Sequence, residues 1–518
     1  MVKVLNAHKN HPVEPLGVGY LASSIARGGH ESKLMLTSRN MGEAVEQVTQ
    51  KINEYQPDIF AQSIIFGSHG YAIELNNRIK ERFPRIVGFL GGPAATFTPE
   101  LIKRGFDAIC RYEGENPFLE FCNALEAGDD VGNIPNIWVN ENPDLYHTEV
   151  KNEKQNLDVD GVGYREESGY DPKRRRFVNK TRKLLQDEEL TKIPSPDREV
   201  LYENEIYRES PIKHFMHTRG CVHRCKYCHV HVMNAENKGK GKILRWVGDE
   251  AMAEEIMKVK KKYGFLNGYF QDDIAGPSYS AKKAKDFRDV FRKLGLEMHF
   301  HVRFDHIARE PDIAKYLAEA GVTGVHAAIE SGDDYIRNEI HGRDMTTDEI
   351  LRGAKHLRDN GIKIMTQNIL GAPGETREQM LKTLELNIAV QPTFASASIF
   401  QPYPGTTALE IARDMGILPT ANQDELIDTF GLETFYNKSI MVQNPEQKRW
   451  LESFQKFFAI AVEVPQLYNS GVLEKIVSNY HQWNGTGREL EHMYRLHRAK
   501  TDEELYGVKL EEVVMEEN

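Results

Sequence analysis

The sequence predicts an α/β protein with a doubly wound, Rossmann-like N-terminal domain, a partial (β/α)6 TIM-like barrel after it, and a helical C-terminal region. Short apolar runs alternate with amphipathic stretches from position 2 to 126 and again from 243 to 406. Such alternation is typical of βαβ units with parallel strands. With 518 residues, the chain is also too long for a single hydrophobic core. We expect domains at residues 1–135, 211–410 and 411–518, with a connector at 136–210.

The composition is that of an ordinary globular protein. Hydrophobic residues make up 40% of the chain and charged residues 28%, and no apolar run approaches the roughly 18 residues that a membrane span requires. The N-terminal stretch MVKVLNAHKNHPVEP lacks the apolar segment of a secretory signal. We therefore expect a cytoplasmic protein without a transmembrane segment. The net charge of −11 argues against nucleic acid as a partner.

The first domain is expected to consist of short strands, each followed by a loop and a helix. Strands are predicted at residues 2–5, 59–66 and 86–91, and helices at 16–28, 41–54, 70–83 and 117–126. In a parallel sheet of this kind, ligands bind at the carboxyl ends of the strands. The loops at those ends should therefore carry the binding residues.

Three glycine-containing segments occupy these loops: PLGVGYLASSI, GGPAATFTPE and FDAICRYEGENPF. Gly91, Gly92 and Gly114 allow the backbone to approach a bulky ligand. In this order, over about residues 1–135, the segments resemble the N-terminal cobalamin-binding domain of B12-dependent radical SAM enzymes. The resemblance implies bound cobalamin, with contacts from Leu16, Gly17, Ser63, Gly91, Gly92, Pro93, Glu113, Gly114 and Glu115.

Three residues of this domain are interpreted without a ligand. B12 domains of the methionine-synthase type supply a cobalt-bound histidine from an Asp-x-His-x-x-Gly motif. Here His8 stands in NAHKNH, without the Asp or the Gly. We interpret His8 as a loop histidine and keep cobalt coordination as the alternative. Cys110 and Cys122 stand at apolar positions and are expected to be packed core thiols.

The connector, residues 136–210, is polar and rich in turn-forming residues, as in NENPD and DVDGVGYREESGYDPKRRRF. We expect short strands and turns on the surface there, with little core of their own.

Three of the chain's five cysteines fall within GCVHRCKYCHV. Cys221, Cys225 and Cys228 have the spacing C-x3-C-x2-C, which can ligate three irons of a [4Fe–4S] cube and leave the fourth iron open. The alternative is a zinc site, which needs a fourth ligand. The candidates for that ligand are His223, His229 and His231.

This spacing resembles the signature of the radical S-adenosylmethionine (SAM) superfamily. After a strand at HFMHTRG, strands are predicted at 243–246, 267–273, 297–305, 324–332, 363–376 and 396–406, with helices at 249–263, 281–294, 312–320, 347–360 and 377–389. Such barrels place their chemistry at the C-terminal ends of the strands. The resemblance implies a [4Fe–4S] cluster on the cysteines and SAM bound by Tyr227, Asp272, Asp273, Arg303, Glu330, Ser331 and Gly371. Arg343 is a second candidate for the SAM carboxylate, and a surface salt bridge is the alternative for both arginines.

The resemblance also implies an activity. In this family the reduced cluster cleaves SAM to a 5′-deoxyadenosyl radical, and methylcobalamin supplies a methyl group. We expect a C-methyltransferase acting on an unactivated carbon of a small molecule, lipid, peptide or protein, with an electron donor such as flavodoxin or ferredoxin. The alternatives are a cyclase or oxidase, such as the anaerobic tetrapyrrole cyclases, and a non-enzymatic cobalamin- or metal-binding module. A methylthiotransferase would need three further cysteines, and only Cys110 and Cys122 remain.

The C-terminal region is expected to be helical, as in PEQKRWLESFQKFFAIAVEVPQLY and GRELEHMYRLHRAK, and to cap the mouth of the barrel. Its aromatic positions Phe454, Phe457 and Phe458 are interpreted as helix packing and not as cofactor contacts.

Overall fold

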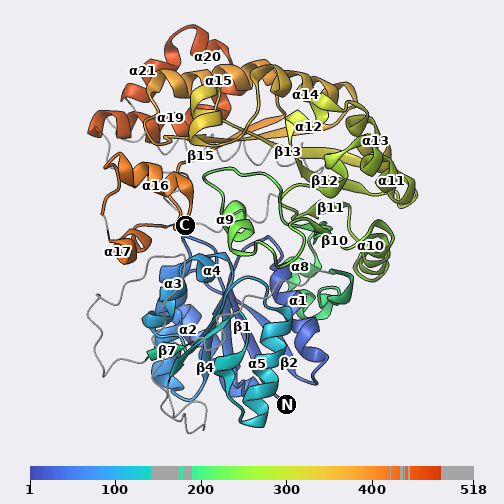
Figure 1. The fold of residues 1–518 in the computed structure, drawn as a ribbon, viewed down its shortest axis with the longest axis vertical. Coiled ribbons are helices and arrows are strands. Elements are labelled where there is room, and N and C mark those ends of the chain that lie inside the picture. The colour runs from blue at the N-terminus through green and yellow to red at the C-terminus, as the bar shows by residue number, and fades with distance from the viewer. Residues whose placement is uncertain are drawn as a thin grey trace. The chain divides into compact units, whose positions relative to one another are not determined.

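The fold is given by a computed structural model (Figure 1). The described residues are 1–141, 176–178, 190–420, 422–431, 436, 438–441 and 444–479. Contacts divide the chain into two compact units. The first comprises Met1–Glu209 and Asn237–Gly241, and the second comprises Ser210–Glu236 and the residues from Lys242 on. The domain limits expected from the sequence stay predictions.

The first unit is built on a mainly parallel sheet with the strand order β2-β1-β3-β4-β5-β6-β7. Its parallel strands are β1 (Lys3–Lys9), β2 (Glu31–Thr37), β3 (Ile59–Ser63), β4 (Val87–Gly91) and β5 (Ala108–Cys110). Two short strands, β6 (Ile137–Glu141) and β7 (Arg176–Val178), extend it in the antiparallel sense. The inner strands are mostly buried because both faces of a parallel sheet are covered. The sequence prediction missed β2, an edge strand whose residues are mostly half-buried.

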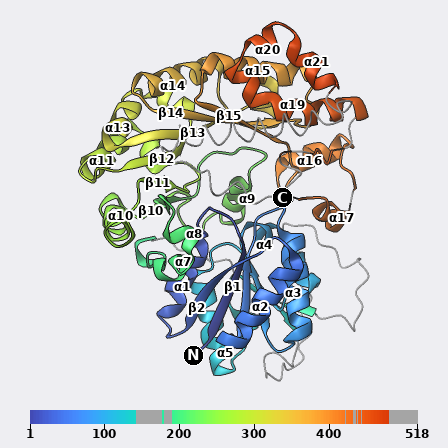
Figure 2. The same ribbon diagram turned by 180° about the vertical axis from the view of Figure 1, so that it is seen from behind.

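Helices cover both faces of this sheet, as the opposite views in Figures 1 and 2 show. On one face, Val4 packs in a core cluster with residues of α1 (Leu16–Ala26) and α5 (Glu115–Ala127). On the other face, Leu5 packs with residues of α2 (Met41–Tyr55) and α3 (His69–Arg82). Successive β1 residues therefore enter opposite cores, as the two-residue period of a strand requires. This is the predicted doubly wound arrangement.

The end of the connector folds onto this unit through a buried ion pair. Arg198 begins α7 (Arg198–Tyr202), and its Nη1 lies 2.8 Å from Oε2 of Glu14 in the loop before α1. The Tyr202 hydroxyl also donates to Glu14, at 3.2 Å from Oε1. Both charged side chains are at least nine-tenths buried. The loop between β1 and α1 is thus held by charge as well as by apolar packing.

Replacing Arg198 with methionine should lower the free energy of unfolding by about 3–5 kcal/mol, since the Glu14 carboxylate would stay buried without its cation. The double variant Arg198→Met with Glu14→Leu should regain most of this loss, because no charge is then buried. Urea unfolding of the single and double variants measures both effects. An unchanged midpoint for Arg198→Met would contradict this account of the ion pair.

The second unit is built on six parallel strands in the order β15-β14-β13-β12-β11-β8. The strands are β8 (Ile212–Phe215), β11 (Asn267–Phe270), β12 (Glu297–Val302), β13 (Val322–Glu330), β14 (Lys363–Leu370) and β15 (Phe394–Ile399). The helices between them are α10 (Asp249–Tyr263), α11 (Ala281–Phe291), α12 (Phe304–Arg309), α13 (Asp312–Ala320), α14 (Thr347–Asp359) and α15 (Arg377–Val390). The predicted partial barrel is confirmed.

One predicted barrel strand lies elsewhere. Within 243–246 only β10 (Arg245–Trp246) is extended, and it pairs antiparallel with β9 (Thr218–Arg219) in a separate two-stranded sheet. The first barrel strand is instead β8, just before the cysteines. The reason is local, since the 243–246 run follows the cysteine segment and pairs with its start instead of crossing to the main sheet.

The described C-terminal helices pack in two places: α16 (Thr407–Asp414) lies in a cluster with Tyr227 of the cysteine segment, and the longest helix covers the outside of the barrel. Helix α19 (Pro445–Glu463) packs against β15 and α15. Phe454, Phe457 and Phe458 are buried there with Leu384, which confirms their predicted packing role. The expected cap over the barrel mouth is not formed by α19, and GRELEHMYRLHRAK lies outside the described residues. Among the described helices, none has the length and hydropathy needed to span a bilayer.

Candidate functional site

The three clustered cysteines lie in the loop between β9 and α9 (His229–Glu236). Gly220 opens this loop with φ +89°, and a Cβ there would clash with the Ile243 carbonyl oxygen. Lys226 donates its backbone N–H to the His341 carbonyl at 2.9 Å. Only glycine fits the first turn, and tertiary hydrogen bonds fix the rest of the loop.

The three thiols form a set that suits a cluster. Cys225 is buried, while Cys221 and Cys228 are half-buried. Burial raises the pKa of Cys221 and of Cys228, and a thiolate at either neighbouring cysteine raises the Cys228 pKa further. Three mutually interacting soft donors in a partly enclosed loop fit a [4Fe–4S] cube, whose binding would displace the thiol protons.

A single zinc ion fits this loop less well. Among the described residues, no three His, Cys, Asp or Glu side chains converge on one point as ligands of one ion. A cube needs no such convergence, because each thiolate binds a different iron. The candidate fourth ligands also have other partners: His223 contacts His306, His229 the Pro404 carbonyl, and His231 the Thr407 hydroxyl.

Two adjacent aspartates follow β11 and have different surroundings. Asp272 is buried and accepts hydrogen bonds from the His217 and Thr218 backbone N–H groups and from the Thr218 hydroxyl. Burial still raises its pKa to about 6. Asp273 is exposed, and its charge raises the pKa of both Cys221 and Cys228. Asp273 is therefore the carboxylate beside the thiols that is open to a ligand, and Asp272 holds the strand ends together.

Tyr227 and Glu330, two of the predicted SAM contacts, lie next to Arg343 in the structure. The Tyr227 hydroxyl donates to the Glu330 carboxylate, and Arg343 Nη1 lies 3.3 Å from the Tyr227 oxygen. Glu330 ends β13 at φ +66°, beside a register shift in the sheet. For a non-glycine residue this conformation costs free energy and is characteristic of functional sites.

Arg303 presents one guanidinium nitrogen without a partner. Its Nε donates to Asp305 at 2.8 Å and its Nη2 to the Arg343 carbonyl at 2.7 Å. Its Nη1 is buried and has no hydrogen-bond partner among the described residues. Arg303 is 1% exposed and Arg343 6%, so neither forms the surface salt bridge considered as the alternative. A buried, unpaired guanidinium N–H is a strong site for a carboxylate.

Ser331 and Gly371 serve turns in this structure. Ser331 is fully buried, and its Oγ accepts from the Asp333 backbone N–H. Gly371 has φ +78° and donates its N–H to the buried Glu375 carboxylate at 2.6 Å. Neither residue contacts the cysteine loop in these hydrogen bonds.

The sequence interpretation missed a polar layer on the face of the barrel sheet opposite its helices. The Tyr269 hydroxyl lies 2.7 Å from His301 Nε2, and the His301 and His326 rings stack at 5.0 Å. Burial lowers the pKa of His301 to about 4, so it is neutral at pH 7. The signal was present in EMHFHVRFD, where His299, His301 and Arg303 alternate and therefore share one face of the strand.

The predicted cobalamin loops meet at one edge of the first unit. In the strand order β2-β1-β3-β4, the direction in which the chain winds across the sheet reverses between β1 and β3, and ligands bind at such switch points, beyond the carboxyl ends of the strands. Gly17 and Pro93 are exposed; Ser63, Gly91, Gly92, Glu113 and Gly114 are half-buried; Leu16 and Glu115 are buried. A Cβ on Gly91 would meet no atom of the described residues within 4 Å. This open space beside a glycine suits the close approach of a large planar cofactor.

His8 is not in a loop. It lies within β1, where its Nδ1 is 3.0 Å from the Lys9 carbonyl oxygen. Cys110 and Cys122 are buried among the apolar residues of the sheet and α5, which confirms that they are core thiols.

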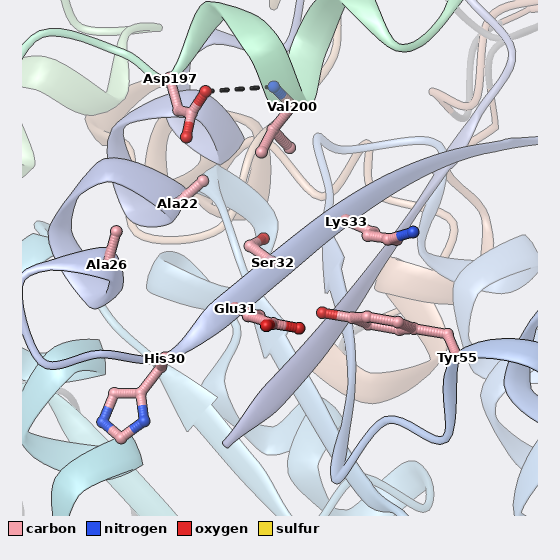
Figure 3. A pocket seen from close by; sticks show the side chains of 9 residues that line it. All are labelled: Ala22, Ala26, His30, Glu31, Ser32, Lys33, Tyr55, Asp197 and Val200. Atoms are coloured by element: carbon pink, nitrogen blue, oxygen red, sulfur yellow. Dashed lines mark hydrogen bonds between the residues drawn. The ribbon is translucent and has the colours of Figure 1, made fainter. Parts of the chain in front are cut away.

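A surface pocket lies in the first unit, away from the cobalamin loops. It encloses about 260 Å³ and is lined by Ala22, Ala26, His30, Glu31, Ser32, Lys33, Tyr55, Asp197 and Val200 (Figure 3). It lies at the start of β2, the end of the sheet away from the cobalamin loops. Its Asp197 carboxylate accepts the Val200 N–H as the cap of α7. We assign this pocket no role in the chemistry.

Comparison with known proteins agrees with the two-part organisation. The family model described as the Radical SAM superfamily matches residues 215–386, and the B12 binding domain matches residues 2–121. An uncharacterized methyltransferase of Pyrococcus horikoshii, PH0819, is 27% identical over 414 residues, covering 79% of this chain and 80% of that protein. The anaerobic magnesium-protoporphyrin IX monomethyl ester cyclase of Rubrivivax gelatinosus is 25% identical over 401 residues, covering 75% and 64%.

A solved structure shares the fold. That of TsrM, a radical S-adenosylmethionine methyltransferase from Kitasatospora setae, aligns with a TM-score of 0.59 at 18% identity, covering 80% of this chain and 76% of that one. Both family models match in the order in which the two parts occur. The chain therefore belongs to the cobalamin-dependent radical SAM enzymes, in which a B12-binding domain precedes a radical SAM domain.

Proposed function

We propose that this protein is a cobalamin-dependent radical SAM methyltransferase that places a methyl group on an unactivated carbon. One observation carries the proposal: a single chain has both a three-thiol loop on a radical SAM barrel and, on a B12-binding domain, a glycine, Gly91, that leaves room for a ligand. Similarity to PH0819, named a methyltransferase, supports methyl transfer over other outcomes.

Each cofactor is assigned to residues of this chain. Cys221, Cys225 and Cys228 hold the [4Fe–4S] cluster, and the loops that contain Gly17, Gly91–Pro93 and Glu113–Glu115 hold cobalamin. When bound, these groups and SAM supply an electron, a carbon-centred radical and a methyl group. The protein's own contribution is to hold the ligands in place and exclude water.

The SAM site is assigned by complementary charge. The Asp273 carboxylate beside the thiols takes the SAM ammonium group, and the unpaired Arg303 Nη1 takes the SAM carboxylate. Tyr227 and Glu330 face the nucleoside part. Asp272, Ser331 and Gly371, the other predicted SAM contacts, support this site from their turns.

The cluster, once held by the three cysteines, would take its electron from an external donor of low potential such as flavodoxin or ferredoxin. The three thiols must stay reduced before the cluster assembles, and the cytoplasm is the compartment that keeps them so.

A second function has a specific observation in its favour, the similarity to the Rubrivivax cyclase. The two functions differ in their products. Methyl transfer yields a methylated product with 5′-deoxyadenosine and S-adenosylhomocysteine in equal amounts, because one SAM provides the radical and another the methyl group. Cyclisation or oxidation yields 5′-deoxyadenosine without S-adenosylhomocysteine.

The test is chromatography with mass detection on the anaerobic, reconstituted full chain, incubated with cell extract and methyl-labelled SAM. A labelled product at equal yield of both nucleosides supports the proposal. 5′-Deoxyadenosine alone, with a product that carries no label, would replace it with the cyclase function. Absence of both nucleosides would leave a binding module.

Replacing Asp273 with asparagine should raise the KM for SAM about 10- to 100-fold, because a charge-assisted hydrogen bond contributes about 1.5–3 kcal/mol. Iron content should stay that of the wild type. SAM-dependent formation of 5′-deoxyadenosine measures the effect. The matched variant Asp272→Asn turns an amide N–H toward three donors and should lower the unfolding midpoint instead. Equal KM values for Asp273→Asn and wild type would contradict the assignment.

A further inference from the structure

Arg343 occupies an unusual position next to a cluster ligand. Its Nη1 lies 3.7 Å from the Cys225 sulfur, within hydrogen-bond range for sulfur, and its Nη2 donates to the Ala328 carbonyl at 2.7 Å. The side chain is 6% exposed, and Cys225 is 7% exposed. A guanidinium stays protonated in proteins. A permanent cation therefore faces one of the three cysteines in a region shielded from water.

The position of this cation is fixed from several sides. Arg303 Nη2 donates to the Arg343 backbone carbonyl at 2.7 Å, so the residue is held through its main chain as well as its guanidinium. Glu330 lies 4.0 Å from Nη1, which offsets part of the positive charge. Both Nη atoms of Arg343 are already directed at a thiol, a tyrosine and a carbonyl, and only its Nε lacks a partner among the described residues. The terminal Nη1 of Arg303 is therefore the better partner for a ligand carboxylate.

A cation next to a cluster sulfur changes the electron affinity of the cluster. Reduction adds one negative charge to a centre that three thiolates already make anionic, and a nearby positive charge stabilises the reduced form. Hydrogen bonds to the sulfurs act in the same direction and are among the main factors that set the potentials of such clusters.

We infer that Arg343 is a positioning residue that raises the reduction potential of the cluster through Cys225. The negative charge of Glu330 offsets part of this effect and so limits the rise in potential. The inference rests on the proposed function only in that the three cysteines bind a [4Fe–4S] cluster. The sequence alone made Arg343 a candidate for binding the SAM carboxylate, and this inference gives it a different role.

The test is an EPR-monitored redox titration of the reconstituted full chain without SAM. The variant Arg343→Met should shift the midpoint to a more negative potential, so that the reduced-to-oxidised ratio at a fixed potential falls about tenfold, which equals about 59 mV for one electron. Arg343→Lys should shift the midpoint less than Arg343→Met does, because lysine retains the charge but not the forked geometry. The control Arg352→Met removes an exposed arginine of α14 and should not move the midpoint.

Glu330→Gln gives an independent measurement with the opposite sign. Removing its negative charge should shift the midpoint to a more positive potential. If Arg343→Met fails to hold iron, Glu330→Gln and Arg343→Lys decide the question. A midpoint equal to that of the wild type in the iron-replete variants overturns the inference. A wild-type chain that binds no cluster overturns the proposed function instead, and the iron assay separates these outcomes.

Discussion

Replacing Cys225 with serine should remove the iron–sulfur cluster and reduce SAM cleavage to the background of iron-free protein. Serine offers a hard oxygen where the cluster requires a thiolate. Because Cys225 is the buried member of the set, no solvent molecule can readily replace it. Iron and sulfide per chain, the brown absorbance of the cluster and 5′-deoxyadenosine yield measure the effect.

The matched control is Cys122→Ala, which removes a thiol buried in the core of the first unit. It should leave iron content and SAM cleavage unchanged, at a modest cost in stability. Wild-type iron content in Cys225→Ser would show that the loop does not hold a cluster in the way described here.

Two neighbouring glycines should respond to substitution in opposite ways. Gly92 has φ +91°, and a Cβ there would lie 2.5 Å from the Ile64 carbonyl oxygen and 2.7 Å from its nitrogen. Gly92→Ala should therefore destabilise the cofactor-free chain by about 2–4 kcal/mol, since neither backbone atom can move far. At Gly91, a Cβ would have no atom of the described part of the chain within 4 Å. Gly91→Leu should leave stability within about 0.5 kcal/mol of the wild type.

The effect on cobalamin distinguishes the two sites. A leucine at position 91 would occupy the space assigned to the corrin, so cobalamin retained after reconstitution should fall at least about tenfold, which corresponds to a loss of about 1.4 kcal/mol in binding. Urea unfolding and the absorbance of bound cobalamin measure the two quantities. Full retention of cobalamin by Gly91→Leu would show that the ligand binds elsewhere.

Much of the architecture was predictable because strong local patterns coincide with buried strands and helices. The apolar runs around Ile59 and Val87 became β3 and β4, and the C-x3-C-x2-C spacing located the thiol loop. The edge strand β2 was missed, because a strand with one open edge needs few apolar residues. The 243–246 run was misplaced because strand partners are set by tertiary contacts that no local pattern records.

Within the candidate site, residue types were predictable but their tasks were not. Asp272 and Asp273 are neighbours in the sequence, yet the donors that engage Asp272 lie 54 and 55 residues earlier. Arg303 and Arg343 look equivalent as cations. Only the folded chain shows that Arg303 keeps its terminal Nη1 unpaired among the described residues, while the Nη1 of Arg343 is directed at Cys225. Such differences arise from long-range geometry.

The unequal burial of the three thiols also has a consequence for handling the protein in air. Sulfur oxidation follows accessibility, so dioxygen should attack at the half-buried Cys221 and Cys228 before it reaches Cys225. Early damage would then be confined to one side of the centre. We expect that brief aeration leaves a species that added iron and a mild thiol can repair, and that prolonged aeration does not.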